Sequence, residues 1–291
     1  MLEIFEMEFM QRAWLAGLIM ATICPIIGSF LVLRRQSLIG DGLGHIAFAG
    51  VAGGALGGYN PVLSAAIATV LGALAIERVR TRLSDAADMV LAIFFYSGMG
   101  LAVIFTGLNQ EGGLNLSSIL FGSLMTVSRQ DLLVVILLAF LTILFVISTY
   151  HSLEYLTFDE TCAKVAGLPV ASLNLLLALL TALTVALSMR IVGLLLVSAM
   201  MVIPVACALQ TAYSFKSTIY QSIAYGLATV AIGLTASYYI NLAPGGTIVV
   251  TGTLLFLGST FLKSKPKQAA GPCPVCENRP KMRYRLFGKR K

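Results

Sequence analysis

Charged residues are scarce in this chain, and their scarcity excludes an ordinary soluble fold. Asp, Glu, Lys and Arg make up 11% of the 291 residues, whereas a typical soluble domain carries about 25%. Hydrophobic residues reach 58% of the sequence, so most of the surface must face lipid or neighbouring helices rather than water. The composition therefore predicts an all-α polytopic membrane protein.

Several motifs are missing as well. The sequence contains neither the G-x-x-x-x-G-K-[ST] pattern of a P-loop nor the H-E-x-x-H pattern of a zinc protease. The chain is therefore not expected to be an enzyme, and the energy for any transport must come from a partner or an ion gradient. Its first residues, MLEIFEMEF, carry glutamates where a secretory signal has lysines. The five cysteines are scattered and imply no disulfide framework.

Nine apolar segments approach the roughly 20 residues that a helix needs to cross a bilayer. We expect spans at Ala13–Leu33, Ser37–Tyr59, Pro61–Ile76, Met89–Gly107, Leu132–Thr149, Pro169–Met189, Ile191–Phe215, Ser217–Asn241 and Gly246–Leu262. One further segment, Ile119–Val127, is too short to span and could be re-entrant; if one of the spans is re-entrant instead, eight crossings remain. Pro25 and Pro204 lie inside apolar spans, where each either kinks its helix near a substrate site or is a tolerated bend.

The net charge of +7 reflects membrane topology rather than nucleic-acid binding, because the basic residues occupy short loops and one tail. We expect an extracellular segment at residues 1–12, a transmembrane domain at residues 13–262 and a basic cytoplasmic tail at residues 263–291. Lys and Arg in short loops mark the cytoplasmic side. That side would then hold the Arg34–Arg35 turn, a Glu77–Arg82 loop, Lys164, Lys216 and the tail.

The most informative stretch is SLIGDGLGHIAFAGVAGGALGG, which is long enough to span and yet contains Asp41 and His45. The two are four residues apart, so on a helix they share a face. We expect His45 near mid-bilayer, about 15 Å from the cytoplasmic arginines. A carboxylate and an imidazole suit Zn²⁺ or Mn²⁺; the alternative is a buried pair that only locks two helices together. Glycines are expected to strip one side of this helix for close packing, at positions 40, 44, 50, 54 and 58.

A second motif, TFDETCAKVAGLPV, is a short polar segment between two long spans. Thr157 could cap a helix that begins at Phe158, with acidic residues in its first turn. Ala163 and Gly167 would leave a smooth face for docking on a partner, and the alternative is an ordinary interfacial helix. In the tail, Cys273-Pro274-Val275-Cys276 is half of a thiolate zinc site, which a dimer could complete; the alternative is a disordered tail with reduced thiols.

The sequence resembles the permease subunits of bacterial ABC importers for zinc, manganese and related divalent metals. The resemblance runs from about Ala13 to Leu262 and rests on SLIGDGLGHIAFAGVA, FDETCAKVAGLPV, VGLLLVSAMMVIPVACA and APGGTIVVT, in that order. It implies a type II-like permease with eight to nine spans in the bacterial plasma (inner) membrane, forming a homodimer around a central path. It also implies two cytoplasmic ABC ATPase subunits, an extracellular metal-binding protein, and no permanently bound cofactor beside the transported metal.

In this family Asp41 and His45 fall on an Asp-x-x-x-His motif in the metal path. The segment around residue 160 resembles the coupling helix that docks on the ATPase, and its candidate residues are Thr157, Phe158, Asp159, Glu160, Ala163 and Gly167. Gly44 stands where many relatives have serine, which favours zinc, with manganese or iron as alternatives. The residues alone also leave open a gradient-driven secondary transporter with a proton relay, a membrane enzyme using the same pair as acid and base, or a permease for siderophores or vitamins.

Overall fold

A computed structural model describes residues 8–83, 86–108, 122, 128–240 and 242–261, and its regular elements are all helices. They are α1 (Glu8–Leu33), α2 (Ile39–Leu56), α3 (Pro61–Arg82), α4 (Ala87–Leu108), α6 (Arg129–Phe158), α7 (Glu160–Val165), α8 (Val170–Val192), α9 (Leu194–Thr211), α10 (Phe215–Ile240) and α11 (Pro244–Phe261). Within these ranges, nine helices are long and apolar enough to cross a membrane, all but the short α7. The expectation of nine spans is thus confirmed, whereas the Ile119–Val127 segment lies outside the described residues.

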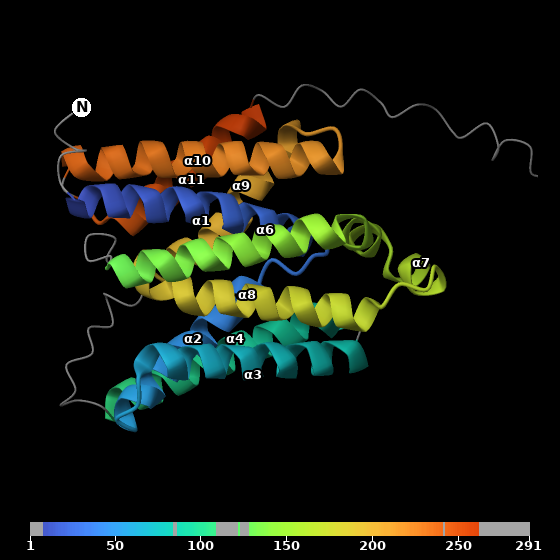
Figure 1. The fold of residues 1–291 in the computed structure, drawn as a ribbon, viewed down its shortest axis with the longest axis horizontal. Coiled ribbons are helices and arrows are strands. Elements are labelled where there is room, and N and C mark those ends of the chain that lie inside the picture. Colours follow the sequence, from blue (N-terminus) through green and yellow to red (C-terminus); the bar gives the residue numbers. More distant parts are fainter. Residues whose placement is uncertain (1–7, 84–85, 109–121, 123–127, 241, 262–291) are drawn as a thin grey trace, which may run out of the picture.

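The long helices run side by side in three groups (Figure 1). Helices α1, α10 and α11 lie on one side with α9, while α2, α3 and α4 pack together on the other. Helices α6 and α8 lie between them, and α8 contacts helices of both groups. The short α7 projects from one end of the bundle.

Local sequence fixes where several helices begin. Asn60 accepts a hydrogen bond from the amide of Val62 at 3.0 Å, and Pro61 occupies the first position of α3, where its missing N–H costs nothing. Ser128 and Asp131 form a reciprocal capping box at the start of α6. These caps satisfy backbone donors that would otherwise be left unpaired at the helix termini.

Both prolines lie inside continuous helices. Pro25 lies within α1, where it removes the donor that would bond the carbonyl of Ala21. Helix α10 approaches at that point, and a Cβ on Gly226 would come within 2.6 Å of the Ala21 oxygen. Pro204 likewise lies inside α9. The chain breaks instead at Gly193, whose φ of 90° separates α8 from α9 in one residue.

The expected Glu77–Arg82 loop is wrong, because α3 continues as a helix to Arg82. Glu77 and Arg80 are buried there and paired to each other, which lets a charged segment stay helical. The basic segments do gather at one end. Glu160 in α7 contacts both Arg34 and Lys164, and the ring of Phe215, next to Lys216, lies 5.7 Å from that of Phe158.

Candidate metal site and coupling segment

Asp41 lies in the first turn of α2, the end of the helix nearest the Arg34–Arg35 turn. An acidic side chain is favourable there because the exposed amides of a helix N-terminus carry partial positive charge. His45 follows one turn later, about 9 Å from the start of α2 by the helical rise. The pair therefore lies within the first seven residues of the 18-residue helix.

The imidazole of His45 is half-buried against α4. Its ring meets the edge of Phe95, with 4.7 Å between ring centroids and 82° between ring planes. Its Nδ1 is buried and has no hydrogen-bond partner among the described residues. A buried polar atom without a partner costs free energy, so this nitrogen is one that a ligand could satisfy.

Asp41 lines a cavity of about 490 Å³ between α2, α9 and α11. Two hydroxyl-bearing residues, Ser37 and Ser198, line the same cavity, and the other walls are mainly apolar side chains and the glycines 245 and 246. Asp41 is also close enough to act electrostatically on His45. The carboxylate thus opens onto a space that could admit a cation, while the imidazole is held from the other side by α4.

Close helix packing surrounds this pair. A Cβ on Gly98 of α4 would lie 2.9 Å from the backbone nitrogen of Ile46 and 3.1 Å from the carbonyl carbon of His45. A Cβ on Gly44 would collide with the side chain of Leu194 at the start of α9. Only glycine permits these approaches without displacing a neighbour.

The expectation that the glycines of α2 clear a single face is wrong. Gly40 and Gly44 pack toward α9, whereas Gly50 and Gly54 face α3, where a Cβ on Gly50 would come 2.9 Å from the Cα of Ala65. The fifth glycine, at position 58, lies beyond the end of α2 with a φ of 69°. These glycines therefore serve close packing against both α9 and α3.

Candidate metal-binding side chains are sparse in the part of the chain that the structure describes. Over the described residues, no group of three or more His, Cys, Asp or Glu side chains is placed to hold a metal ion. Within the described part of the chain, Asp41 and His45 are therefore not joined by a third such side chain. The tail cysteines Cys273 and Cys276 lie outside the described residues.

The coupling segment begins later than expected, and its cap is Asp159 rather than Thr157. Helix α6 continues through Phe158, and the hydroxyl of Thr157 donates to the carbonyl of Leu153 within α6. Asp159 then accepts from the amides of Thr161 at 2.8 Å and Cys162 at 2.9 Å and caps α7. The hydrogen bond from the Cys162 amide is the main reason that the pKa of Asp159 lies below its usual value.

Helix α7 has one face on the bundle and one face free. Ala163 is fully buried, so the small side chain seats α7 rather than opening a docking surface as expected. Phe158 and Val165 are exposed, at 69% and 85%. Gly167 ends the segment with a φ of 79°, which a side chain would strain. A partner that approached this end of the molecule would meet these exposed residues.

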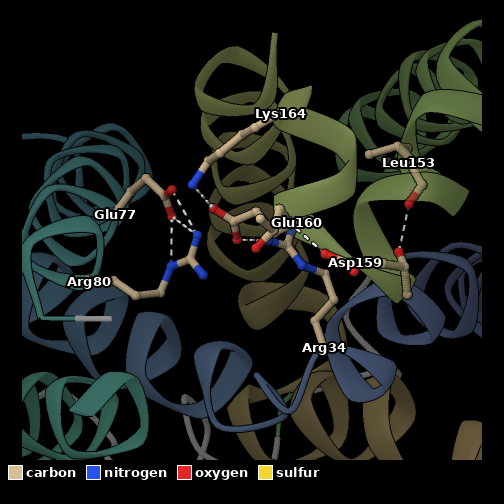
Figure 2. A network of polar contacts seen from close by, with 9 residues as sticks. Arg34, Glu77, Arg80, Leu153, Asp159, Glu160 and Lys164 are labelled. Carbon is tan, nitrogen blue, oxygen red and sulfur yellow. Dashed lines mark hydrogen bonds and ion pairs between the residues drawn. The ribbon is translucent and has the colours of Figure 1, made fainter. Parts of the chain in front are cut away.

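Glu160 connects α7 to the rest of the basic end (Figure 2). Its carboxylate lies 2.9 Å from Lys164 and 3.5 Å from Arg34, whose side chain is only 6% exposed. Beside it, Glu77 and Arg80 form a buried ion pair with a closest contact of 2.8 Å. Partial burial raises the pKa of Glu160, but Lys164, followed by Arg34 and Arg80, outweighs burial and holds that pKa below its usual value.

Sequence reasoning treated Arg34, Glu77 and Arg80 only as markers of topology. The i,i+3 spacing of Glu77 and Arg80 could have signalled a helical ion pair. Nothing in the sequence could have paired Arg34 with Glu160, because 126 residues separate them and the contact depends on the assembled bundle.

Comparison with known proteins agrees with this architecture. The chain is 35% identical over 255 residues to a "Probable metal transport system membrane protein" of Treponema pallidum, covering 87% of this chain and 95% of that protein. It is 29% identical to the high-affinity zinc uptake system membrane protein ZnuB of Haemophilus influenzae, covering 89% and 99% of the two chains. It is also 29% identical to the manganese transport system membrane protein MntC of Halalkalibacterium halodurans, covering 90% of each.

A solved structure gives the same result for the fold. PsaBC from Streptococcus pneumoniae, in complex with Fab, contains a chain that superposes with a TM-score of 0.78 at 29% identity, covering 90% of this chain and 94% of that one. The fold and sequence define the membrane-spanning subunit of an ABC transporter, whose ATPase is a separate subunit. Residues 6–263 match the ABC 3 transport family, and the chain belongs to that family.

Proposed function

We propose that this protein is the permease of an ATP-driven importer of divalent metal ions and that Asp41 and His45 contact the metal on its way through. The observation that carries the proposal is the buried, unpartnered Nδ1 of His45 one helical turn from a carboxylate that lines a cavity. Such a pair is expensive inside a membrane span unless it serves a polar path. The zinc and manganese transport proteins among its relatives support the same class of cargo.

Zinc is the metal we propose, with manganese as the competing cargo. An imidazole nitrogen and a carboxylate oxygen are both ordinary zinc ligands. The relatives do not favour either metal, since the zinc and manganese proteins are equally identical to this chain, at 29%. Two copies of the chain, related by a two-fold axis, would supply four ligands in place of two. Incomplete coordination within each copy would also let the ion leave.

The end that carries α7 is proposed to face the cytoplasm, with the N-terminus outside and an extracellular binding protein delivering the metal there. The basic residues support this orientation, because Arg34, Arg80, Lys164 and Lys216 all lie at that end. Helix α7 would then meet the ATPase, and hydrolysis would drive the helices between outward-open and inward-open states.

Uptake by the reconstituted importer tests the proposal. The permease and its ATPase are placed in liposomes with the binding protein, and radioactive zinc and manganese are supplied in separate assays. Asp41→Ala and His45→Ala should each reduce uptake to background while both subunits still co-purify. Normal uptake in both variants would remove the proposed site. Uptake that needs a proton gradient but no ATP would instead indicate a secondary transporter.

A further inference from the structure

The contact between Arg34 and Glu160 joins the coupling segment to the turn that precedes the metal-binding helix. Glu160 belongs to α7, and Arg34 is the first residue after α1. Their side chains approach to 3.5 Å, and the guanidinium is almost fully buried, with 6% of its side chain exposed (Figure 2). The Glu160 side chain is 37% exposed, so the contact is partly buried, and water screens such a pair less than a fully exposed one.

The turn that holds Arg34 is short and closed by its own hydrogen bonds. The amide of Gln36 donates to the carbonyl of Leu31 at 2.8 Å, and the amide of Ile39 donates to the carbonyl of Gln36 at 3.1 Å. Arg35 takes a left-handed φ of 57°, which tightens the turn. A displacement of Arg34 is therefore passed to the start of α2, since the connection contains little slack. Asp41 lies in the first turn of that helix.

Among the charged groups near Arg34, Glu160 makes the direct contact. Burial lowers the pKa of Arg34, and the nearby guanidinium of Arg80 lowers it further, while Glu160 acts in the opposite direction. Glu77 is already held by Arg80 through contacts of 2.8, 2.9 and 3.1 Å. Glu160 and Glu77 together offset the repulsion between the guanidinium of Arg34, in the turn after α1, and that of Arg80 in α3. Losing Glu160 would remove the direct side-chain contact between α7 and the Arg34 turn.

Helix packing provides a second possible connection from α7 to α2, besides the ion pair. The main helical contacts of α7 within the described part of the chain are with α6 and α8, its neighbours in sequence. Helix α8 in turn contacts α2, where Val185 approaches Gly44. A movement of α7 could therefore reach α2 either through α8 as a rigid body or through the ion pair. Only the second route depends on charge.

We propose that Arg34 and Glu160 are a positioning pair, and that their contact transmits the displacement of α7 to α2 and so to Asp41 and His45. This inference rests on the proposed function, because it assigns a route for the energy of ATP hydrolysis to the metal site. The pair does not touch the metal. Instead, the pair makes the first turn of α2 move together with the segment that meets the ATPase.

The test measures metal transported per ATP hydrolysed by the complete importer in liposomes. Arg34→Gln and Glu160→Gln should each lower this ratio at least fivefold while the ATPase subunit still co-purifies. The double variant should be no worse than the more damaged single variant, because both changes break the same contact. Arg190→Gln is the matched control: it removes an exposed ion pair of 3.6 Å with Asp131, which also joins two helices but involves neither α7 nor the Arg34 turn. Its ratio should equal that of the native protein.

Reversing the pair separates coupling from simple misfolding. Arginine at position 160 would be repelled by Lys164, so the reversal is made in a Lys164→Gln background. Arg34→Glu with Glu160→Arg in that background should recover at least half of the ratio measured for Lys164→Gln alone, whereas either reversal alone should not.

Native ratios in Arg34→Gln and Glu160→Gln would overturn the inference and indicate the α8 route. Low ratios that the reversal does not rescue would also overturn it, since the pair would then be merely structural. These outcomes are distinct from failure of the proposed function, in which the native importer would move no metal or Asp41→Ala would transport normally.

Discussion

Substituting Gly98 by alanine should disturb the metal site from a neighbouring helix without touching a ligand. The added Cβ would lie 2.9 Å from the nitrogen of Ile46, and ordinary contact begins at 3.4 Å, so α4 must retreat from α2 by about 0.5 Å (3.4 minus 2.9). The closest atom belongs to the backbone and cannot rotate away. Overpacking of this kind costs about 1–3 kcal/mol. Phe95, one turn earlier on α4, would move with it and release the edge of the His45 ring.

Gly100→Ala provides the matched control on the same helix. No atom lies within 4 Å of a Cβ at position 100, so this change should gain only the helix propensity of alanine, up to about 1 kcal/mol. The two variants therefore differ only in contact with α2, and the difference in their stability should be about 1–3 kcal/mol.

The assay compares apparent melting temperatures of the two purified variants in detergent and their zinc uptake with the ATPase present. Gly98→Ala should melt lower and show a raised KM for zinc, whereas Gly100→Ala should match or exceed the native protein in stability and keep its KM. Equal stability and equal KM in the two variants would refute the close approach of α4 to α2 at His45.

Two further changes test the basic end. Asp159→Ala removes the cap of α7, so hydrogen exchange of the Thr161 and Cys162 amides should accelerate. The pKa of Asp159 is lowered in the folded protein, so the carboxylate caps α7 at neutral pH. The difference in exchange rate from the native protein should therefore persist at neutral pH and vanish as the pH falls through that lowered pKa. An unchanged exchange rate at pH 7 would contradict the cap. Glu77→Gln leaves the buried charge of Arg80 without its partner and should destabilise the protein by about 3 kcal/mol. The destabilisation is measured as loss of monodisperse protein on heating. The double variant Glu77→Gln with Arg80→Gln should lose clearly less stability, because no unpaired charge remains. Equal losses in the single and double variants would show that the pair is not a buried ionic contact.

The number of spans could be predicted from sequence because hydrophobic length is a local property. The ends of the spans could not. Helix α3 runs on to Arg82 because Glu77 and Arg80 neutralise each other in a buried position, which depends on the helices around them. Thr157 and Asp159 are both good caps by residue type. Asp159 is the residue that caps α7, because Leu153 and Leu156 are buried and keep α6 helical up to Phe158.

The candidate ligands were visible in the sequence because ionisable residues in a membrane span stand out. Their surroundings were not, since spacing does not tell which neighbour each glycine meets. Gly44 and Gly54 look equivalent in a four-residue repeat, yet one lies against Leu194 and the other against Ser64. Ten residues of helix turn through about 1,000°, so these two positions point in different directions. The packing partners follow from the assembled bundle alone.

The two proposed ligands are held by different parts of the bundle, and this difference suits transport. Asp41 faces a cavity walled by α9 and α11, while His45 leans on Phe95 of α4. A shift of α2 along either neighbour would therefore change the surroundings of the two side chains unequally. A cation shared between them would lose one contact before the other, which lowers the barrier to release relative to a rigid site that must break both contacts together. A fixed, complete coordination shell would bind more tightly and transport more slowly, so the proposed two-ligand arrangement suits a metal importer.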